Sequence, residues 1–284
     1  MIMCDNVLSS SLDSEILTGD EENLADNYNH PIEGLIYTPC NIPGPGANIE
    51  DFETQYAVGC SCRNGICVSE LDCECIRSYN RSYDGNGCLL PERIVGCIME
   101  CNSLCLCGHQ SRCGNRICQH GPADGLEICM TGNGKGMGLR TTKKIAVGSF
   151  ICEYAGEIIG IEEAKRRAQS QSDSDMNYIF VLNEHLANGN LLKTCVDPTV
   201  IGNIGRYINH SCQPNSVVIP VRTNTLIPKI GIFAASVIQP GEEITFDYGG
   251  NSSAECNVKS NKLCLCGSTN CKKYLPYDAL LYLE

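Results

Sequence analysis

The chain has 284 residues, of which 43% are hydrophobic, so it can form one large domain with small satellites. It has no apolar run of about 18 residues, and residues 1–29 lack the basic start and apolar stretch of a secretory signal. We therefore expect neither a membrane span nor secretion. The net charge of -12 disfavours strong direct binding to DNA and favours a basic partner.

Residues 1–55 are polar, acidic and rich in turn formers. No Lys or Arg precedes Arg63, whereas residues 1–62 contain 11 Asp and Glu. We expect an acidic, flexible N-terminal segment with a short ordered end near Pro43–Gly46. Such a block of charge is typical of a solvated tail, and contact with a basic partner is the alternative.

The second segment, residues 56–121, contains a dense array of cysteines and little hydrophobic periodicity. A cysteine-rich chain without a secretory signal is more typical of metal binding than of disulfides, and bound metal stabilises a region that lacks a large core. Nine cysteines form the array: Cys60, Cys62, Cys67, Cys73, Cys75, Cys101, Cys105, Cys107 and Cys113.

Nine thiolates can hold three tetrahedral zinc ions if three of the thiolates bridge two ions each. Several independent four-cysteine sites fit a set of nine poorly, and a disulfide knot is the second alternative. Cys88 and Cys97 lie in the gap of the array and could replace one of the nine.

Residues 122–249 contain few cysteines and many short apolar runs separated by turn signals such as Pro240-Gly241. Helix-forming residues and one charged face predict a helix at Ile161–Gln171. The fold class is therefore mostly β, with small sheets. The predicted strands are Phe150–Tyr154, Tyr178–Leu182, Leu191–Val196, Val217–Val221, Ile230–Ala235 and Glu243–Tyr248.

The last segment, residues 250–284, begins with a Ser- and Asn-rich linker and continues with Cys264, Cys266 and Cys271. A structural zinc ion takes four ligands, so a fourth must come from elsewhere, and we choose Cys212. An open three-ligand site or a redox pair is the alternative. Together the two arrays predict about four zinc ions.

Four motifs lie in order between the two cysteine arrays. The first lacks the spacing of dinucleotide-binding and phosphate-binding glycine loops, and any one of the four could be ordinary turn or core. Their combined order is far more specific. The motifs are Gly134–Arg140, Glu153–Glu157, Gly202–Asn215 and Gly241–Tyr248.

This arrangement resembles the SET-domain histone-lysine methyltransferases, with a pre-SET domain at 56–121, a SET domain at 122–249 and a post-SET zinc motif within 250–284. The resemblance implies a knot-like threading of the C-terminal strand. It also implies transfer of a methyl group from S-adenosylmethionine to a lysine ε-amine.

The resemblance assigns catalytic roles to Tyr248, Tyr154 and Phe246. A phenylalanine at position 246 implies room for a di- or trimethylated product. The implied contacts to S-adenosylmethionine are Lys135, Gly136, Met137, Tyr178, Arg206, Asn209, His210 and Leu265.

The implied partner is a histone tail, with histone H3 or the nucleosome expected, and the implied location is nuclear chromatin. The alternatives are a non-enzymatic, zinc-stabilised chromatin-binding module and a methyltransferase of non-histone proteins. A nucleophilic pair of Cys212 and His210 is a further alternative, although the zinc role explains Cys212 better. The sequence leaves the oligomeric state open.

Overall fold

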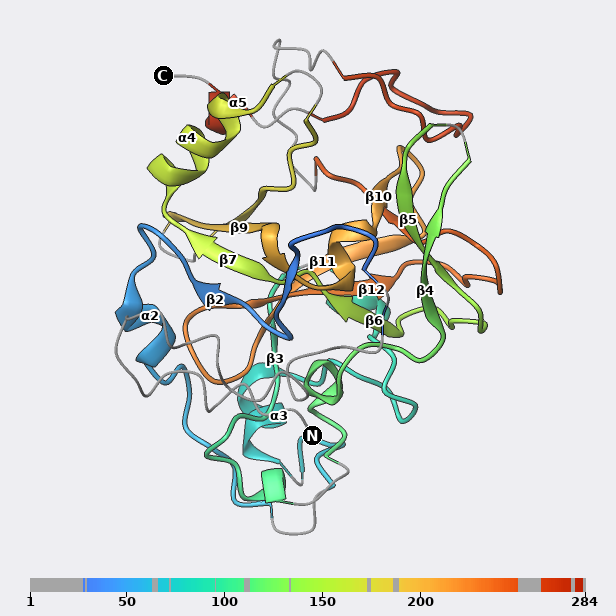
Figure 1. The fold of residues 1–284 in the computed structure, drawn as a ribbon. Helices are drawn as coiled ribbons and strands as arrows, with labels where there is room; N and C mark the ends of the chain where they lie inside the picture. Colours follow the sequence, from blue (N-terminus) through green and yellow to red (C-terminus); the bar gives the residue numbers. More distant parts are fainter. Residues whose placement is uncertain are drawn as a thin grey trace.

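The computed structural model describes residue 28 and residues 30–282, except for 63–65, 72, 95, 110–112, 133, 173–174, 186–188, 250–261 and 277–278. The acidic residues 1–27, for which we expect flexibility, lie outside the described residues. Small sheets fill the upper part of the molecule, and the cysteine-rich segment with α3 (Glu74–Tyr79) forms the lower part (Figure 1). In the described part, no helix has the length and apolar character needed to cross a membrane.

The largest sheet has five strands and takes its two short strands from the N-terminal segment. Both of these strands run parallel to the strand they join, whereas β7 and β8 are antiparallel to β9. The described end of the segment is thus part of the fold. The path is β1 (Ile36–Tyr37), β9 (Leu191–Gly202), β7 (Gly156–Ile159) and β2 (Ile42–Pro43), with β8 (Phe180–His185) paired to β9.

The helix α2 (Ile49–Glu53) follows β2. Its first turn is capped by Asn48, whose side chain accepts a hydrogen bond from the Glu50 amide. Phe52 is buried and joins the main hydrophobic core, so the chain between β2 and the cysteine-rich segment is held against the central β region at 122–249.

A four-stranded sheet connects the cysteine-rich segment to the central β region at 122–249. Its inward side chains, including Ile219, Ile230 and Phe233, are almost fully buried, and this burial is the main stabilising contribution here. The order is β3 (Ile98–Met99), β11 (Ser216–Arg222), β12 (Lys229–Ala234) and β6 (Phe150–Glu153).

The two smallest sheets carry the expected site motifs. The strands β4 (Leu126–Met130) and β5 (Met137–Thr141) form a hairpin, and the glycine-rich motif lies in its turn and second strand. The strands β10 (Asn209–His210) and β13 (Thr245–Phe246) pair in parallel, with Asn209 opposite Thr245 and His210 opposite Phe246. The third and fourth motifs therefore meet directly.

The prediction of a mostly β fold with small sheets is confirmed. The predicted helix is α4 (Ile161–Ser170), which buries Ala164 and Ala168. All six predicted strands are present, but their boundaries are shifted. β8, for example, begins at Phe180 rather than Tyr178 and ends at His185, and the largest changes are in β9 and β13. β9 continues to Gly202 because its second half pairs with β1 and β7, and β13 is only two residues long because Glu243 pairs with Arg140 instead.

One arginine of α4 ties this helix to the largest sheet. The Nη1 atom of Arg167 lies 2.8 Å from carboxylate oxygens of both Glu157 and Asp197, and its Nε lies 2.8 Å from Glu163. The Asp197 side chain is only 2% exposed. Without Arg167, a buried carboxylate would lose its cation.

We predict that Arg167→Met lowers the free energy of unfolding by about 3 kcal/mol, because removing one partner of a buried ion pair leaves an uncompensated charge. The matched control is Arg166→Met, which removes an exposed partner of the same Glu163 and should cost about 0.5 kcal/mol or less. Thermal melting of the two variants checks this. Equal melting temperatures would contradict it.

Candidate active site and metal centres

The nine cysteines of the first array converge in one buried cluster, which also contains Ile76. Their sulfur atoms form overlapping groups whose members all lie within 4.8 Å of one another, and Cys101 belongs to three of these groups. Cys75 joins through a sulfur–sulfur distance of 3.6 Å to Cys105. Overlapping sets of thiols fit a multinuclear zinc cluster, in which some thiolates bridge two ions.

The two cysteines that could have replaced a ligand lie elsewhere. The Cys88 sulfur is 3.6 Å from the Ser149 hydroxyl, and the Cys97 sulfur accepts a hydrogen bond of 2.8 Å from Arg222. Neither belongs to a metal-binding group found among the described residues. No disulfide joins the cysteines of the described part, which disfavours the disulfide alternative.

In the second array, Cys212 lies with the three C-terminal cysteines as a fourth potential ligand. Cys212, Cys264, Cys266 and Cys271 place their sulfur atoms within 4.8 Å of one another. Backbone amides support the group, since the Lys272 amide donates to the Cys212 sulfur at 3.3 Å. Four thiols in this arrangement fit a closed structural zinc site.

The glycine-rich motif packs against Asn209. The Asn209 side-chain amide donates to the Met137 carbonyl at 3.0 Å and to Glu243 at 2.9 Å. The Lys135 ammonium forms an ion pair with the other oxygen of Glu243. The Glu243 carboxylate thus joins Lys135 to Asn209, and Asn209 in turn holds Met137; the sequence did not single out Glu243.

Glycine is required at two places in this motif. Gly136 has a φ of +83°, a conformation that side-chain-bearing residues rarely adopt. A Cβ atom at Gly138 would lie 2.4 Å from the Thr131 side chain and 3.1 Å from the Asn209 amide. The motif therefore brings backbone close to Asn209. Leu265 covers it from the second cysteine array, 3.9 Å from the position of a Cβ on Gly134.

Arg206 and Tyr178 form the next part of the site. The Arg206 guanidinium lies 4.4 Å from the centre of the Tyr178 ring and donates through Nε to the Pro198 carbonyl. Its Nη1 is buried and has no hydrogen-bond partner among the described residues. A buried donor needs a partner, and the carboxylate of S-adenosylmethionine would supply one.

Four aromatic rings form a cluster next to Tyr178. Phe246 lies 6.1 Å from Tyr154, 6.0 Å from Phe180 and 4.9 Å from Tyr248, measured between ring centres. The structure thus brings together all three residues with an expected catalytic role. It adds Phe180, which was part of a predicted strand but had no signal of its own.

Both tyrosine hydroxyls of the cluster donate to backbone carbonyls. The Tyr154 hydroxyl donates to Tyr178, and the Tyr248 hydroxyl donates to Ile208 at 2.9 Å. Burial raises the pKa of both phenols, so they stay neutral near pH 7. Their oxygen lone pairs can therefore accept a further hydrogen bond.

His210 links this cluster to the second cysteine array. Its Nδ1 accepts from the Tyr248 amide at 3.2 Å, and its Nε2 lies 3.3 Å from the Cys212 sulfur. Because Cys212 belongs to the four-cysteine group, the zinc interpretation fits it better than a nucleophilic pair with His210.

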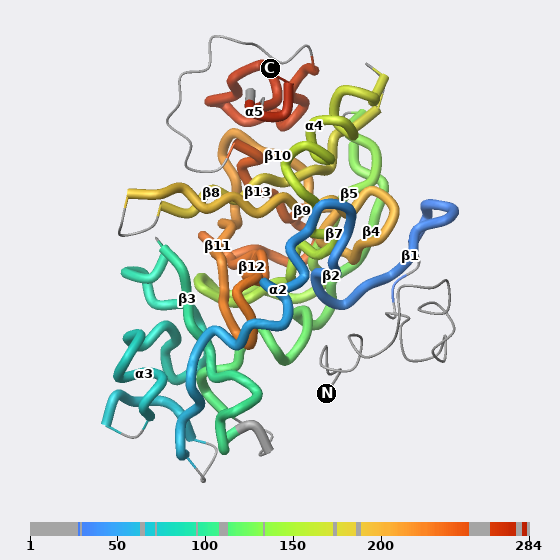
Figure 2. Tube along the Cα trace, turned by 90° about the vertical axis from the view of Figure 1, so that its left-hand side faces the viewer, coloured from blue at the N-terminus to red at the C-terminus, as the bar shows by residue number. Residues whose placement is uncertain are grey.

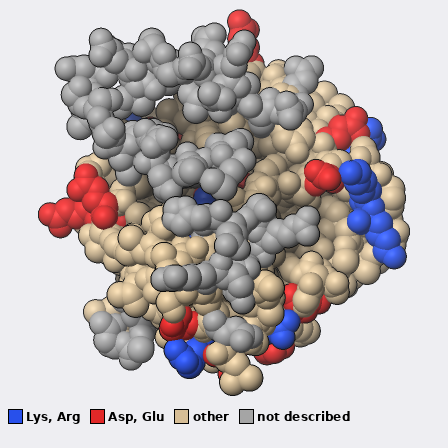
Figure 3. All heavy atoms as spheres, turned by 90° about the horizontal axis from the view of Figure 1, so that it is seen from below, with Lys and Arg blue, Asp and Glu red and all other residues tan. Residues whose placement is uncertain are grey.

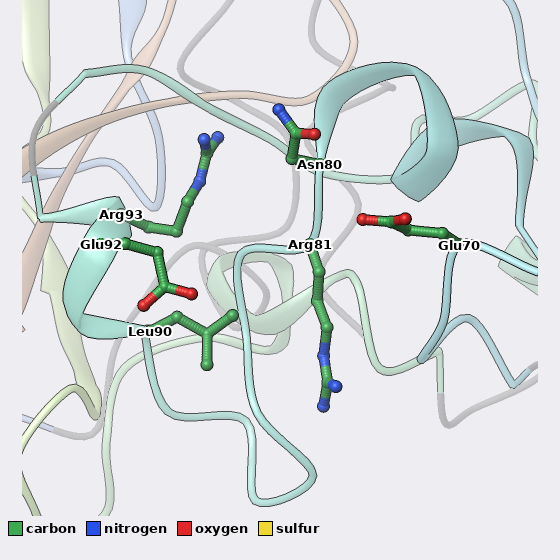
Figure 4. A pocket seen from close by; sticks show the side chains of 6 residues that line it. All are labelled: Glu70, Asn80, Arg81, Leu90, Glu92 and Arg93. Atoms are coloured by element: carbon green, nitrogen blue, oxygen red, sulfur yellow. The ribbon is translucent and has the colours of Figure 1, made fainter.

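A separate hollow of about 530 Å³ lies on the cysteine-rich segment (Figure 4). Its side chains carry both charges and include none with an expected catalytic or cofactor role. The lining residues are Glu70, Asn80, Arg81, Leu90, Glu92 and Arg93.

Comparisons with known proteins agree with this geometry. The SET domain model matches residues 136–249, and the Pre-SET motif model matches residues 20–116. Mouse histone-lysine N-methyltransferase SETMAR is 43% identical over 87% of this chain and 82% of its own length. A probable histone-lysine N-methyltransferase, set-23 of Caenorhabditis elegans, is 42% identical over 84% of this chain and 95% of its own.

The chain belongs to the SET-domain family of histone-lysine methyltransferases, which use S-adenosylmethionine. The crystal structure of the methyltransferase domain of human SETMAR superposes with a TM-score of 0.75, at 39% identity, over 88% of this chain and 91% of that one. The chain spans 37% of the whole human protein. The segments at 37–39, 44–49, 196–206 and 219–222 already resemble the methyltransferase part of SETMAR in sequence.

We predict that Glu243→Ala weakens binding of S-adenosylmethionine about tenfold, because it releases Lys135 and one donor of the Asn209 amide. The neighbouring Glu242, which contacts Asn215 at the surface, provides the control variant Glu242→Ala. Isothermal titration with the methyl donor measures both. The prediction is wrong if the two variants bind equally well.

Proposed function

We propose that this chain methylates a lysine of histone H3 and forms di- or trimethyl-lysine. The observation that carries the proposal is the parallel pairing of β10 with β13. In this pairing Asn209 lies opposite Thr245 and His210 lies opposite Phe246, and the His210 ring is 5.4 Å from that of Tyr248. This supports a site in which residues expected to bind the cofactor adjoin the aromatic cluster.

S-adenosylmethionine supplies the methyl group as a sulfonium. On the cofactor side, Lys135, Gly136 and Met137 contribute backbone, Arg206 Nη1 offers a donor to the carboxylate, and Asn209 and His210 complete the site. Leu265, which lies close to Gly134, would cover the adenine end of the bound cofactor. The described geometry is compatible with these roles.

On the lysine side, the amine must be neutral to act as a nucleophile, although the pKa of free lysine is about 10.4. The aromatic walls of Tyr154, Phe180 and Phe246 favour the uncharged form by desolvation. Tyr248 and Tyr154 accept hydrogen bonds from the amine N–H groups and so direct its lone pair at the methyl group.

A histone tail matches the net charge of this chain and the edge strand β8 of its largest sheet. The net charge of -12 favours a basic peptide, and among the described strands β8 pairs only with β9, so its other edge can take an extended peptide. The structure of KRYPTONITE, 30% identical to this chain, contains an H3(1-15) peptide.

Direct DNA binding is not part of the proposal. On the face seen from below, the larger groups of basic side chains have acidic ones beside them (Figure 3). Nuclear, chromatin-associated location follows from the histone substrate. We keep the domain limits of 1–55, 56–121, 122–249 and 250–284 as part of the proposal.

We predict about four zinc ions per chain, three in the first array and one in the second. Cys212→Ser should remove about one ion and leave the other three, whereas Cys88→Ser should remove none. Inductively coupled plasma mass spectrometry of the purified proteins gives the count. A wild-type protein that was folded but free of metal would rule out this assignment.

We predict that the wild-type protein methylates H3 in nucleosomes to the di- or trimethyl state, whereas Phe246→Tyr shifts the product toward monomethyl-lysine. A hydroxyl at position 246 would take the space of an additional methyl group inside the aromatic cluster. Mass spectrometry after incubation with labelled S-adenosylmethionine maps the site and the product state.

Three outcomes of this assay would contradict parts of the proposal. Unchanged product ratios would exclude the role of Phe246. Methylation of other proteins alone would favour a non-histone methyltransferase. No transfer to any protein would favour the non-enzymatic chromatin-binding module.

A further inference from the structure

The chain continues for 13 residues beyond Cys271, the last cysteine, and this tail returns to the active site. It leaves the four-cysteine group beside residues 262–263, where the Leu275 amide donates to the Lys262 carbonyl at 2.9 Å. Pro276 then packs against Gly249, because a Cβ on Gly249 would lie 3.2 Å from the Pro276 Cβ. Gly249 directly follows Tyr248, so the tail supports one end of the aromatic cluster.

The tail contains α5 (Ala279–Tyr282), which lies beside α4 in both views of the chain (Figures 1 and 2). Leu281 is only 1% exposed and joins a small hydrophobic core with Ile159, Ala164 and Ile179. Removing a leucine side chain from water stabilises the packed state, so this contact holds α5 against α4.

The residue after Leu281 makes a polar contact with the segment that carries Tyr178. The Asn177 side-chain amide donates to the Tyr282 hydroxyl at 3.1 Å. The carbonyl oxygen of the same side chain accepts from the Ile179 amide at 3.0 Å. The tail is therefore linked to the residues on both sides of Tyr178: Tyr282 bonds to Asn177, and Leu281 shares a hydrophobic core with Ile179.

Tyr178 contacts both parts of the proposed site, the cofactor side and the lysine side. Its ring lies against the Arg206 guanidinium, and its carbonyl accepts the hydroxyl of Tyr154. A shift of the segment at 177–179 would move the cofactor side and the lysine side together. A displacement of about 1 Å in such a position can reduce turnover by about a hundredfold.

We propose that Leu281 and Tyr282 are positioning residues for methyl transfer, which fix the Asn177–Ile179 segment and through it Tyr178. This inference rests on the proposed function. The two residues touch no reacting atom and act through Asn177 and Ile179. The tail thus has a second attachment point that is independent of the four-cysteine group.

The test compares Tyr282→Phe, which removes one hydroxyl, with Tyr274→Phe, which changes a tyrosine of the same tail that is 42% exposed. Tyr282→Phe should raise the KM for S-adenosylmethionine or lower kcat by about threefold to tenfold, the loss expected for one hydrogen bond. Tyr274→Phe should leave both values unchanged. Zinc content and melting temperature should match the wild type in both variants.

A second pair of variants tests the apolar anchor. Leu281→Ala should cause a larger loss of kcat/KM than Tyr282→Phe, and Leu281→Met, which keeps the volume, should restore most of it. A loss of melting temperature in Leu281→Ala with unchanged kcat and KM would show a purely structural role and overturn the inference.

The two levels of the proposal can fail separately. If the wild type transfers methyl groups and Tyr282→Phe has the same kinetics as Tyr274→Phe, the inference fails and the proposed function stands. If the wild type transfers none, the proposed function fails. Hydrogen exchange at the Ile179 amide then still tests whether Tyr282 fixes the 177–179 segment. Faster exchange in Tyr282→Phe supports this, and unchanged exchange overturns it.

Discussion

The site depends on one short parallel pairing, between β10 and β13. Two residues on each strand cannot form a stable sheet alone, so side chains reinforce the pair. Asn215 accepts from the Thr245 amide at 2.9 Å, and the Ser216 hydroxyl donates to the Thr245 carbonyl at 2.7 Å. Parallel strands require a long connection, and here it contains β11 and β12. The cofactor side and the lysine side are therefore neighbours only in the folded chain.

The two cysteine groups hold the outer parts of the chain to this centre. The first makes a compact unit of a segment with little apolar core, and β3 joins that unit to β11 of the SET region. The second draws the C-terminal tail to Cys212, two residues beyond β10. In both cases metal bound by these thiolates would reinforce small apolar contacts with the rest of the chain, as in other zinc-stabilised units.

The sequence predicted the parts that depend on local pattern or on fixed spacing. The helix at α4, most strands, the two cysteine groups and the choice of Cys212 all agree with the structure. The sequence contained no comparable pattern for contacts between distant segments. Glu243 was one glutamate in a motif, Phe180 one apolar residue in a strand, and Tyr282 lay in a tail without cysteines. Their positions follow from long-range pairing, which propensity and periodicity do not determine. The roles assigned to individual residues remain predictions.

The most direct test of the account is a crystal structure with S-adenosylhomocysteine and a lysine-containing H3 peptide. The account predicts that the lysine side chain enters between Tyr154, Phe246 and Tyr248. It also predicts that the cofactor contacts Asn209 and Arg206 from the opposite side, with the amine pointing at its sulfur. A lysine bound outside the aromatic cluster, or a cofactor away from β10, would contradict the central claim.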